Sequence, residues 1–541
     1  MTDLEIPVGK RTKAYRFFEM VPAILSYGSI ILLVVLSIVS PFAAAAYLLA
    51  VIITTLVKAV GIAYHTTTGR DYLDRAQRVD WHARLGELED AKKYLDTPKD
   101  PSHSFGHSAH LMNLQDIASQ EELYPKPSDV YNAAIIATYN ESYDILGPTI
   151  QSLLDSTYDK DHLIVVIAYE ERGGEAISKT VHRLRDEFGG KFRGFLLVKH
   201  PDGLPNEVVG KGGNITYGGK QLKVWLDEVN IKYNDVVVTT LDSDNRVHPT
   251  YFDYIAYEYI VHPDRKHLSF QPICLFINNI WDVPAPMRVV ATGNSFWNII
   301  SSMRPHTLRN FASHSQPMDA LVEMDFWSTR TIVEDGHQYW RSYFHFNGQY
   351  GVVPIYVPIY QDAVLSSTYV KTLKAQFIQL RRWAYGASDI PYVATRIFTR
   401  NRQVPLGSSI ARLIRLTDSH VTLASIAILI AIGGWVPLFV NGEAAHSIAA
   451  HQLPEVISHV QQVALVGLFI TIFFAFKLLP PRPLRYKRSR NIWMVLQWVL
   501  MPVTAVVYSS ASAFTSQTAL FLGRYFDKFD VTDKATVKTK K

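Results

Sequence analysis

The stretch Val236-Val237-Val238-Thr239-Thr240-Leu241-Asp242-Ser243-Asp244 decides the fold of this chain. Its run of β-branched residues predicts a strand that is buried on both faces, as in a parallel sheet. Two carboxylates follow where the strand ends, and ligands of open α/β sheets bind at the carboxyl ends of strands. Such an Asp-x-Asp pair can hold a divalent cation, and the cation can hold a diphosphate. The pair alone is weak support, because acidic pairs are also common in solvated turns.

Alternating strands and helices surround this stretch. Strands are expected at residues 131–137, 163–168, 192–198 and 269–276, with helices after the first three of them. The strand ends are polar, acidic or rich in glycine, as in residues 138–141, 169–172 and 210–214. The pattern predicts a nucleotide-binding α/β domain. Further strands are expected at residues 331–333 and 352–360, and an amphipathic helix suited to a membrane boundary is expected at residues 371–387.

Composition limits the class of protein. A chain of 541 residues is too long for one ordinary core. The net charge of +5 with 19% charged residues does not indicate a nucleic-acid binder. Cys274 is the single cysteine, so an internal disulfide and a cysteine-rich metal cluster are excluded, and it is expected to be a small core residue.

Apolar stretches at both ends predict membrane spans. Residues 21–40 and 42–63 each approach the roughly 20 residues that a bilayer requires, and the break at Ser40-Pro41 makes them a hairpin. Lys58 lies close enough to the end of the second span to snorkel. Near the C-terminus, residues 420–440 and 460–476 are ordinary spans. Residues 492–522, with Pro502 inside, predict a re-entrant hairpin, two short spans, or one span plus a surface helix, which gives three or four C-terminal spans.

Two segments lie between the N-terminal hairpin and the α/β domain. Residues 71–95 predict an amphipathic helix, either at the membrane surface or against the soluble domain, and an ordinary surface helix is an equally good interpretation. Residues 97–127 are rich in Pro, Ser and His and predict a linker. His103, His107 and His110 have no carboxylate or cysteine at a convincing spacing, so a solvated loop is favoured over a metal site.

Charge predicts the orientation. The loop at residues 477–490 carries six Lys or Arg residues, whereas residues 441–459 carry none. Lys10, Arg11, Lys13 and Arg16 make the N-terminus basic as well. Because cytoplasmic loops are enriched in Lys and Arg, both basic segments and the α/β domain are expected in the cytosol.

Several short motifs occur in a fixed order. They are Thr138-Tyr139-Asn140-Glu141, Lys211-Gly212-Gly213-Asn214, Asp242-Ser243-Asp244 with Pro249, Gln271-Pro272 with Asn278, Val333-Glu334-Asp335 with Arg341, Gln379-Leu380-Arg381-Arg382-Trp383, and Phe529-Asp530-Val531-Thr532-Asp533-Lys534. In these motifs the chain resembles the membrane-embedded family 2 glycosyltransferases, the group that holds cellulose, chitin and hyaluronan synthases. The Gln-x-x-Arg-Trp signature is seen mostly in processive members. The last motif resembles the Phe-x-Val-Thr-x-Lys segment of bacterial cellulose synthases.

The resemblance implies a role for each motif. Asp244, assisted by Asp242, would hold Mg²⁺ or Mn²⁺ against the diphosphate of a nucleotide sugar. Asp335 would be the general base for the acceptor hydroxyl, with its neighbour Glu334 as the alternative base. Trp383 would stack on an acceptor sugar, although an interfacial aromatic anchor is the other interpretation. Donor and diphosphate contacts are expected from Thr138, Asn140, Glu141, Glu170, Lys211, Asp242, Gln379 and Arg382.

Two positions depart from the family pattern. The second strand usually ends in an Asp that contacts the base or ribose, and here Glu170 and Glu171 stand in its place. Residues 311–316 differ from the usual segment before the Glu-Asp motif, which leaves the acceptor open. His314 in that segment is a possible sugar contact, but a structural histidine is the favoured interpretation.

The implied architecture is an α/β, GT-A-type nucleotide-sugar-binding domain inserted between N- and C-terminal transmembrane helices. We expect a transmembrane hairpin at residues 1–66, an amphipathic helix and linker at 67–127, a cytosolic GT-A domain with an interfacial helix at 128–395, a C-terminal transmembrane region at 396–523 and a basic cytosolic tail at 524–541.

The implied function is inverting transfer from a nucleotide sugar, UDP-linked in the first instance, to a growing polysaccharide that is exported across the plasma membrane. Transfer of one sugar to a lipid carrier or membrane glycolipid is the alternative. A transporter with a nucleotide-binding regulatory domain would need a phosphate-binding Gly-x-x-x-x-Gly-Lys-[Ser/Thr] loop and polar residues buried in the spans, and neither is evident. The expected partners are the donor, the acceptor and membrane lipids, with no nucleic acid.

Overall fold

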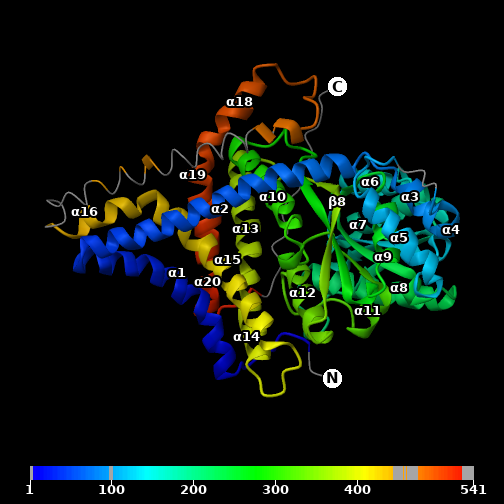
Figure 1. The fold of residues 1–541 in the computed structure, drawn as a ribbon, viewed down its shortest axis with the longest axis horizontal. Helices are drawn as coiled ribbons and strands as arrows, with labels where there is room; N and C mark the ends of the chain where they lie inside the picture. The colour runs from blue at the N-terminus through cyan, green and yellow to red at the C-terminus, as the bar shows by residue number, and fades with distance from the viewer. Residues whose placement is uncertain are drawn as a thin grey trace.

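The computed structural model describes residues 4–96, 101–442 and 473–526 without 475, together with a few single positions between 452 and 459. An α/β domain forms one end of the molecule and a group of long helices forms the other (Figure 1). Helix α13 (Tyr369–Ala384) lies between the two parts and packs against α20 (Ala511–Phe521) of the long helices. The helix predicted near residues 371–387 is therefore confirmed, and it lies at the junction of the two parts.

A mixed sheet is the centre of the α/β domain, with strand order β3-β2-β1-β4-β7-β6-β8-β5. The first four strands in this order, from β3 to β4, are parallel to one another. Their register pairs Thr138 of β1 with Tyr169 of β2, and Ala137 of β1 with Asp242 of β4. The polar strand ends that the sequence predicts to bind ligand are therefore adjacent at one edge of the sheet. These strands are β1 (Tyr131–Thr138), β2 (Leu163–Glu170), β3 (Gly194–His200) and β4 (Val236–Asp242).

The other half of the sheet mixes strand directions. Strand β7 is antiparallel to both β4 and β6, whereas β6 is parallel to β8. Strand β4 is thus buried as predicted, but only one of its neighbours is parallel to it. The strands of this half are β5 (Arg246–Val247), β6 (Leu268–Phe276), β7 (Ser315–Pro317) and β8 (Gly351–Gln361).

Helices cover both faces of the sheet, which strand β1 shows directly. Its fully buried residues alternate between two hydrophobic clusters, with Ala134 and Ile136 in one and Ala133 and Ile135 in the other. An apolar strand of this kind is the pattern of a sheet that is buried on both faces. The helices of the domain are α6 (Tyr143–Leu154), α7 (Gly174–Phe188), α8 (Lys211–Glu228), α9 (Tyr251–Val261), α10 (Ala285–Ser302), α11 (Met318–Glu323), α12 (Glu334–His345) and α14 (Asp389–Ile397).

The strand predicted at residues 331–333 is wrong. This segment is irregular and leads directly into α12. The backbone N–H of Val333 donates to Thr331 Oγ1 (3.3 Å), and such local bonds from Thr side chains compete with sheet formation. Glu334 and Asp335 therefore follow a turn and occupy the first turn of α12, rather than the end of a strand.

The single amphipathic helix predicted at residues 71–95 is also wrong. Helix α2 (Pro41–Ala76) extends beyond the apolar stretch, and the short helices α3 (Trp81–Glu87) and α4 (Ala91–Tyr94) follow it. Asp80 separates them, because its side chain accepts a hydrogen bond from the backbone N–H of Ala83 and caps α3. Trp81 is buried and stacks on Tyr254 of α9 at 3.6 Å, so α3 packs against the α/β domain.

The solvated linker predicted at residues 97–127 contains a helix, α5 (His107–Ser119), while residues 97–100 lie outside the described residues. His110 of this helix is buried. Its Nε2 lies 3.0 Å from Glu87 Oε2 and its Nδ1 lies 3.0 Å from Tyr257 Oη. His110 therefore joins α5 to the domain, and the solvated-loop interpretation is wrong for this residue.

Four helices are long and apolar enough to span a membrane by length and composition. Two are α1 (Lys13–Val39) and α2, and Ser40 separates them by accepting a hydrogen bond from the N–H of Ala43 at the start of α2. The third comprises α15 (Leu406–Ile432) and α16 (Val436–Val440). Lys58 of α2 forms an ion pair with Asp418 of α15 (3.1 Å), so it has a protein partner where we expected it to snorkel alone.

The fourth candidate span, Arg490–Phe521, is one continuous run of helical turns (Figure 1). It comprises α18 (Arg490–Leu496), α19 (Met501–Thr504), η14 (Ala505–Ser510) and α20, with Pro502 in the first turn of α19. The hairpin interpretation of this segment is wrong. Most of the span predicted at residues 460–476 and the motif at residues 529–534 lie outside the described residues.

The N-terminal segment, residues 4–6, packs against the α/β domain. Glu5 forms an ion pair with Arg341 of α12 (3.0 Å) and accepts a hydrogen bond from the hydroxyl of Ser328 (2.7 Å). The hydroxyl of Tyr392 donates to the carbonyl of Leu4 (2.8 Å), and Ile6 is buried. The start of the chain is therefore fixed beside the helix that carries Glu334 and Asp335.

Candidate active site

A cavity of about 540 Å³ lies at the carboxyl ends of β1, β2 and β4, bounded by α12 and α13. It is lined by every residue assigned a site role from the sequence except Asn140, whose side chain is exposed on the loop after β1. The lining residues among them are Thr138, Glu141, Glu170, Lys211, Asp242, Asp244, Glu334, Asp335, Gln379, Arg382 and Trp383.

Glu141 closes the loop that follows β1. Its Oε2 accepts hydrogen bonds from the Thr138 hydroxyl (2.7 Å) and from the backbone N–H groups of Tyr139 (2.8 Å) and Asn140 (3.2 Å). One carboxylate thereby satisfies three donors at the strand end. Glu141 thus shapes the wall of the cavity, in addition to the donor contact predicted for it.

Glu170 at the end of β2 is nearly buried and pairs with the guanidinium of Arg172. The same guanidinium lies over the ring of Tyr139, 4.2 Å from its centroid. Burial opposes the charge on Arg172, but Glu170 favours it, and the pKa of Arg172 is raised. The acidic residue predicted to contact the nucleotide therefore belongs to a pair with Arg172, a partner that the sequence does not single out.

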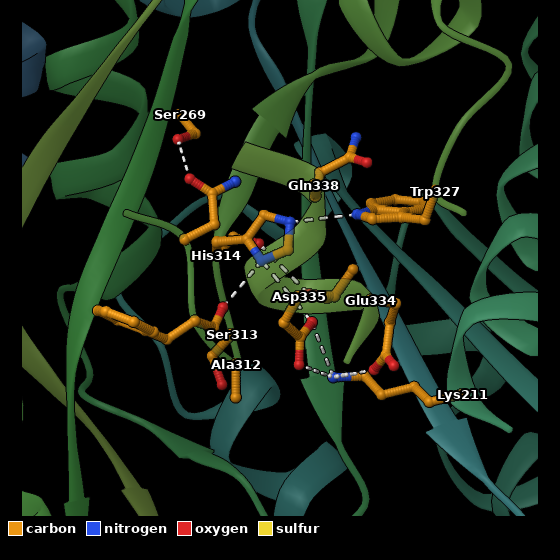
Figure 2. Close-up of polar contacts among 12 residues, drawn as sticks. Lys211, Ser269, Ala312, Ser313, His314, Trp327, Glu334, Asp335 and Gln338 are labelled. Atoms are coloured by element: carbon orange, nitrogen blue, oxygen red, sulfur yellow. Dashed lines mark hydrogen bonds and ion pairs between the residues drawn. The ribbon is translucent and has the colours of Figure 1, made fainter. Parts of the chain in front are cut away.

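Lys211, the first residue of α8, is the electrostatic centre of the site (Figure 2). Its Nζ lies 3.0 Å from Asp242 Oδ1, 3.0 Å from Asp335 Oδ2 and 4.0 Å from Glu334 Oε1. Burial alone would lower the pKa of Lys211, but the three carboxylates outweigh it and raise the pKa. The next residue, Gly212, permits this placement, since a Cβ there would lie 2.4 Å from the carbonyl oxygen of Ser328.

The neighbouring carboxylates Glu334 and Asp335 differ in environment. Glu334 is only 3% exposed, and burial, followed by the charge of Asp335, raises its pKa to about 8. Burial therefore favours the protonated form of Glu334, which cannot accept another proton. Asp335 is more exposed and makes two contacts with Lys211 Nζ, at 3.0 and 3.2 Å. Of the two, Asp335 is the carboxylate better placed to accept a proton.

Asp242 and Asp244 face the same cavity. Asp244 Oδ2 accepts a hydrogen bond from the backbone N–H of Asp362 (3.1 Å), which orients it beside β8. Within the described part of the chain, no group of three His, Cys, Asp or Glu side chains could hold a metal ion. Mg²⁺ is commonly held by one or two carboxylates together with substrate phosphates. Two carboxylates on one cavity therefore fit a cation that binds with a diphosphate, rather than a site closed by protein alone.

His314 lies directly behind Asp335 (Figure 2). Because the indole N–H of Trp327 can only donate, His314 Nε2 accepts that bond (3.1 Å) and the proton is on Nδ1. Nδ1 donates to the carbonyl of Phe311 (2.9 Å) and lies 3.8 Å from Asp335 Oδ1. The ring is fully buried with both nitrogens bonded. This matches the structural histidine favoured from the sequence.

Helix α13 presents the Gln379–Trp383 motif to the cavity. Gln379 Oε1 accepts a hydrogen bond from the side-chain amide of Gln376 (3.1 Å), one turn earlier. The Trp383 ring lies 6.0 Å from the ring of Phe276, at the end of β6. On the other side of the helix, the hydroxyl of Ser516 in α20 donates to the carbonyl of Arg381 (2.5 Å). One helix therefore contacts both the site and a candidate membrane span.

Sequence reasoning missed the half of the cavity that continues past Trp383. That half is lined by residues of α10, the segment before β7, α14 and the candidate spans, namely Asn294, Trp297, Asn298, Arg309, Asp389, Ser419, His420, Ser509 and Ser512. The expectation that the spans bury no polar residues is therefore wrong, because Ser512 is buried and lines the cavity together with His420. Polar side chains within apolar stretches indicate that the spans face a polar space. Arg309 and Asp389 gave no such indication, because the sequence alone does not show that two residues so far apart line the same cavity.

Comparisons with known proteins identify the family. The sequence profile described as "Glycosyl transferase family group 2" matches residues 237–522, more than half of the chain. No curated protein sequence matches the chain.

Solved structures give weaker similarities. A Pyrobaculum calidifontis mannosyltransferase, PcManGT, in complex with GDP-Man and Mn²⁺, has 15% identity and a TM-score of 0.38 over 78% of this chain and 98% of its own. S. aureus TarS 1-349, solved with UDP and with UDP-GlcNAc, has 12% identity and a TM-score of 0.35 over 75% of this chain and 95% of its own. The family match, together with the mixed sheet, supports a GT-A-like domain. This chain is a glycosyltransferase and belongs to glycosyl transferase family group 2.

Proposed function

We propose that the protein transfers a sugar, with inversion, from a UDP-linked donor to a growing polysaccharide and exports the product across the plasma membrane. The observation that carries the proposal is the continuity of the cavity. One space is lined by the Asp242–Asp244 pair, by Asp335, by Trp383 and by residues of two candidate membrane spans. A donor, an acceptor hydroxyl and an elongated product could therefore share one path.

The residues divide the chemistry between them. The acceptor oxygen attacks the anomeric carbon as the bond to the diphosphate breaks, and the bonding electrons leave with the diphosphate. Asp335 takes the hydroxyl proton, and Lys211 holds that carboxylate in position through contacts of 3.0 and 3.2 Å. Gln379 and Arg382 donate hydrogen bonds to the diphosphate, and Trp383 stacks on the acceptor sugar. Because the reaction uses a single base and forms no covalent intermediate, the configuration at the anomeric carbon is inverted.

Asp242 and Asp244 are assigned to Mg²⁺ or Mn²⁺. When bound, the cation supplies positive charge to the departing diphosphate. Thr138, Asn140, Glu141 and Glu170 are assigned to the nucleotide, although Asn140 does not line the cavity and must act from the outer side of its loop. The division of the chain at residues 66, 127, 395 and 523 is kept as part of this proposal, although helix α2 runs through the first of these boundaries to Ala76.

The orientation is proposed to be cytosolic for the α/β domain. Contacts of both basic segments support this orientation. Glu5, just before the basic N-terminal residues, pairs with Arg341 of the domain. Arg485 in the basic loop pairs with Asp282, with its Nη2 2.6 and 2.8 Å from the two carboxylate oxygens. The basic loop thus contacts the domain itself, and so does the segment just before the basic N-terminal residues.

The deciding experiment incubates purified protein with a panel of radiolabelled nucleotide sugars and sizes the product. Long chains made from a UDP-sugar are expected. A product with one added sugar on a lipid would support the alternative of single transfer to a lipid carrier. A protein that releases nucleotide from no member of the panel would refute the proposal.

A further inference from the structure

The unassigned half of the cavity contains the cation Arg309, which has no ion-pair partner in the described part of the chain. Arg309 lines this half, and its ring contact is with Trp340, 5.8 Å from guanidinium to centroid. Among the residues that the structure describes, no carboxylate lies within ion-pairing distance of the Arg309 guanidinium. Arg309 is half-buried, and desolvation lowers the pKa of its guanidinium. A partly buried charge without an ion pair is stabilised by an anion that enters the cavity beside it.

Asp389 lines the same part of the cavity but forms no ion pair with Arg309 among the described residues. Asp389 acts on Arg309 electrostatically, but its Oδ1 is bonded to His337 Nδ1 at 2.7 Å. The other polar residues on this half are neutral amides and hydroxyls together with His420. The charge of Arg309 therefore faces the space of the cavity.

The backbone at Arg309 is held in place by the residues that follow it in the chain. Asn310 is fully buried and its Oδ1 accepts a hydrogen bond from the Ser269 hydroxyl (2.7 Å). The backbone N–H of Phe311 donates to Gln271 Oε1 (2.7 Å). Ser269 and Gln271 both belong to β6, so the sheet anchors the backbone next to Arg309. The backbone that carries Arg309 is therefore fixed at the edge of the cavity, which limits the positions that its guanidinium can reach.

The surroundings indicate a sugar-like ligand. Trp297 is half exposed beside Phe311, with ring centroids 4.4 Å apart, and both line the cavity near Asn294 and Asn298. Aromatic faces and amides suit a sugar, and a guanidinium suits a carboxylate or a phosphate.

We infer that this half of the cavity binds an anionic group of the acceptor, through Arg309. The inference rests on the proposed function, because it names the acceptor class of the same site. The anion is either the carboxylate of an acidic sugar or the phosphate of a lipid-linked acceptor. Neutral chains such as an unmodified glucan would bring no anion to the Arg309 guanidinium.

The test measures binding to the full-length protein in nanodiscs. The probes are a hyaluronan tetrasaccharide for the carboxylate, undecaprenyl phosphate for the phosphate, and chitotetraose as the neutral comparison. Wild-type protein should bind one anionic probe at least tenfold more tightly than chitotetraose. Arg309→Gln should weaken that probe by about 10- to 100-fold, the range expected for a lost charge-assisted hydrogen bond, and leave chitotetraose unchanged. The affinity of Arg309→Lys for that probe should lie between the affinities of wild type and Arg309→Gln.

Arg193→Gln, at an exposed arginine outside the cavity, is the matched control and should change nothing. UDP binding and melting temperature report whether each variant folds. If Arg309→Gln does not fold, the test uses wild-type protein alone. Its preference for an anionic probe over chitotetraose should then be lost when NaCl is raised from 50 to 500 mM, and a preference that persists would overturn the inference. Equal binding of all three probes to wild type, or anionic binding within threefold of wild type in a folded Arg309→Gln, would overturn the inference.

Release of nucleotide from the donor panel is measured on the same samples, so that two failures can be told apart. Nucleotide release without any dependence of anion binding on Arg309 refutes the acceptor assignment and leaves the proposed transfer intact. Anion binding that depends on Arg309, without release from any donor, supports the site and refutes the transfer.

Discussion

Asp335→Asn tests the assignment of the general base. The substitution keeps the shape of the side chain but removes its ability to accept a proton. A general base contributes roughly 10²- to 10⁴-fold, or about 3 to 5 kcal/mol at the transition state. We therefore expect kcat to fall by that factor, with nucleotide binding by calorimetry within threefold of wild type. Glu334→Gln is the matched control, because an amide resembles the protonated carboxyl that Glu334 carries near pH 7.

The pH dependence separates the two carboxylates further. The pKa of Glu334 is raised to about 8 by burial and by Asp335, so Glu334 becomes negative as the pH rises through 8. Wild-type activity should fall over this range, since a second negative charge then opposes the diphosphate, and Glu334→Gln should lack this fall. Because the folded state holds the proton more tightly than the unfolded state, the stability contributed by protonated Glu334 is complete below about pH 4.5 and is lost as the pH rises towards 8.

Two outcomes would refute this reasoning. Asp335→Asn with more than about a tenth of wild-type kcat would show that Asp335 is not the base. A collapse of kcat in Glu334→Gln at pH 7, in a variant that still binds nucleotide, would show that Glu334 is the base and that its proton is lost in the complex with substrate.

Three further predictions concern the metal, the topology and the N-terminal segment. Asp244→Asn should abolish transfer, and full activity of wild-type protein in EDTA would exclude the metal role. In a Cys274→Ser background, an impermeant thiol reagent should label Gly442→Cys from outside intact cells and label Leu484→Cys only after permeabilisation; the reverse pattern would invert the topology. Glu5→Gln should lower the melting temperature by about 2 to 4 °C for each kcal/mol lost with the Arg341 ion pair, and an unchanged melting temperature would mean that the pair contributes little.

The parts of the fold that depend on local sequence pattern were predictable. The apolar β-branched run at β4, the neighbouring parallel strands and the long apolar helices follow from periodicity and length. Carboxylates after β4 were placed correctly because parallel strands end at a common edge. The site residues from five separate motifs line one cavity, as expected if each motif ends or begins an element at that edge.

The parts that depend on distant contacts were not predictable. Strand β7 has three residues and forms only because β4 and β6 lie on either side of it. Helix α5 lies in a segment rich in polar residues and is held by the burial of His110 against Glu87 and Tyr257. Arg309 and His420 line one cavity from positions 111 residues apart, and nothing in either local sequence indicates that they meet.

The contact between the N-terminal segment and the catalytic domain also has a consequence for biogenesis. Glu5 is synthesised well before its partners, because Ser328 follows 323 positions later and Tyr392 later still. Residues 4–6 must therefore wait, undocked, while α1 and α2 insert and most of the α/β domain is synthesised. The last step of assembly is then the docking of residues 4–6 onto a finished domain. A bulky group attached immediately before residue 4 would obstruct this step.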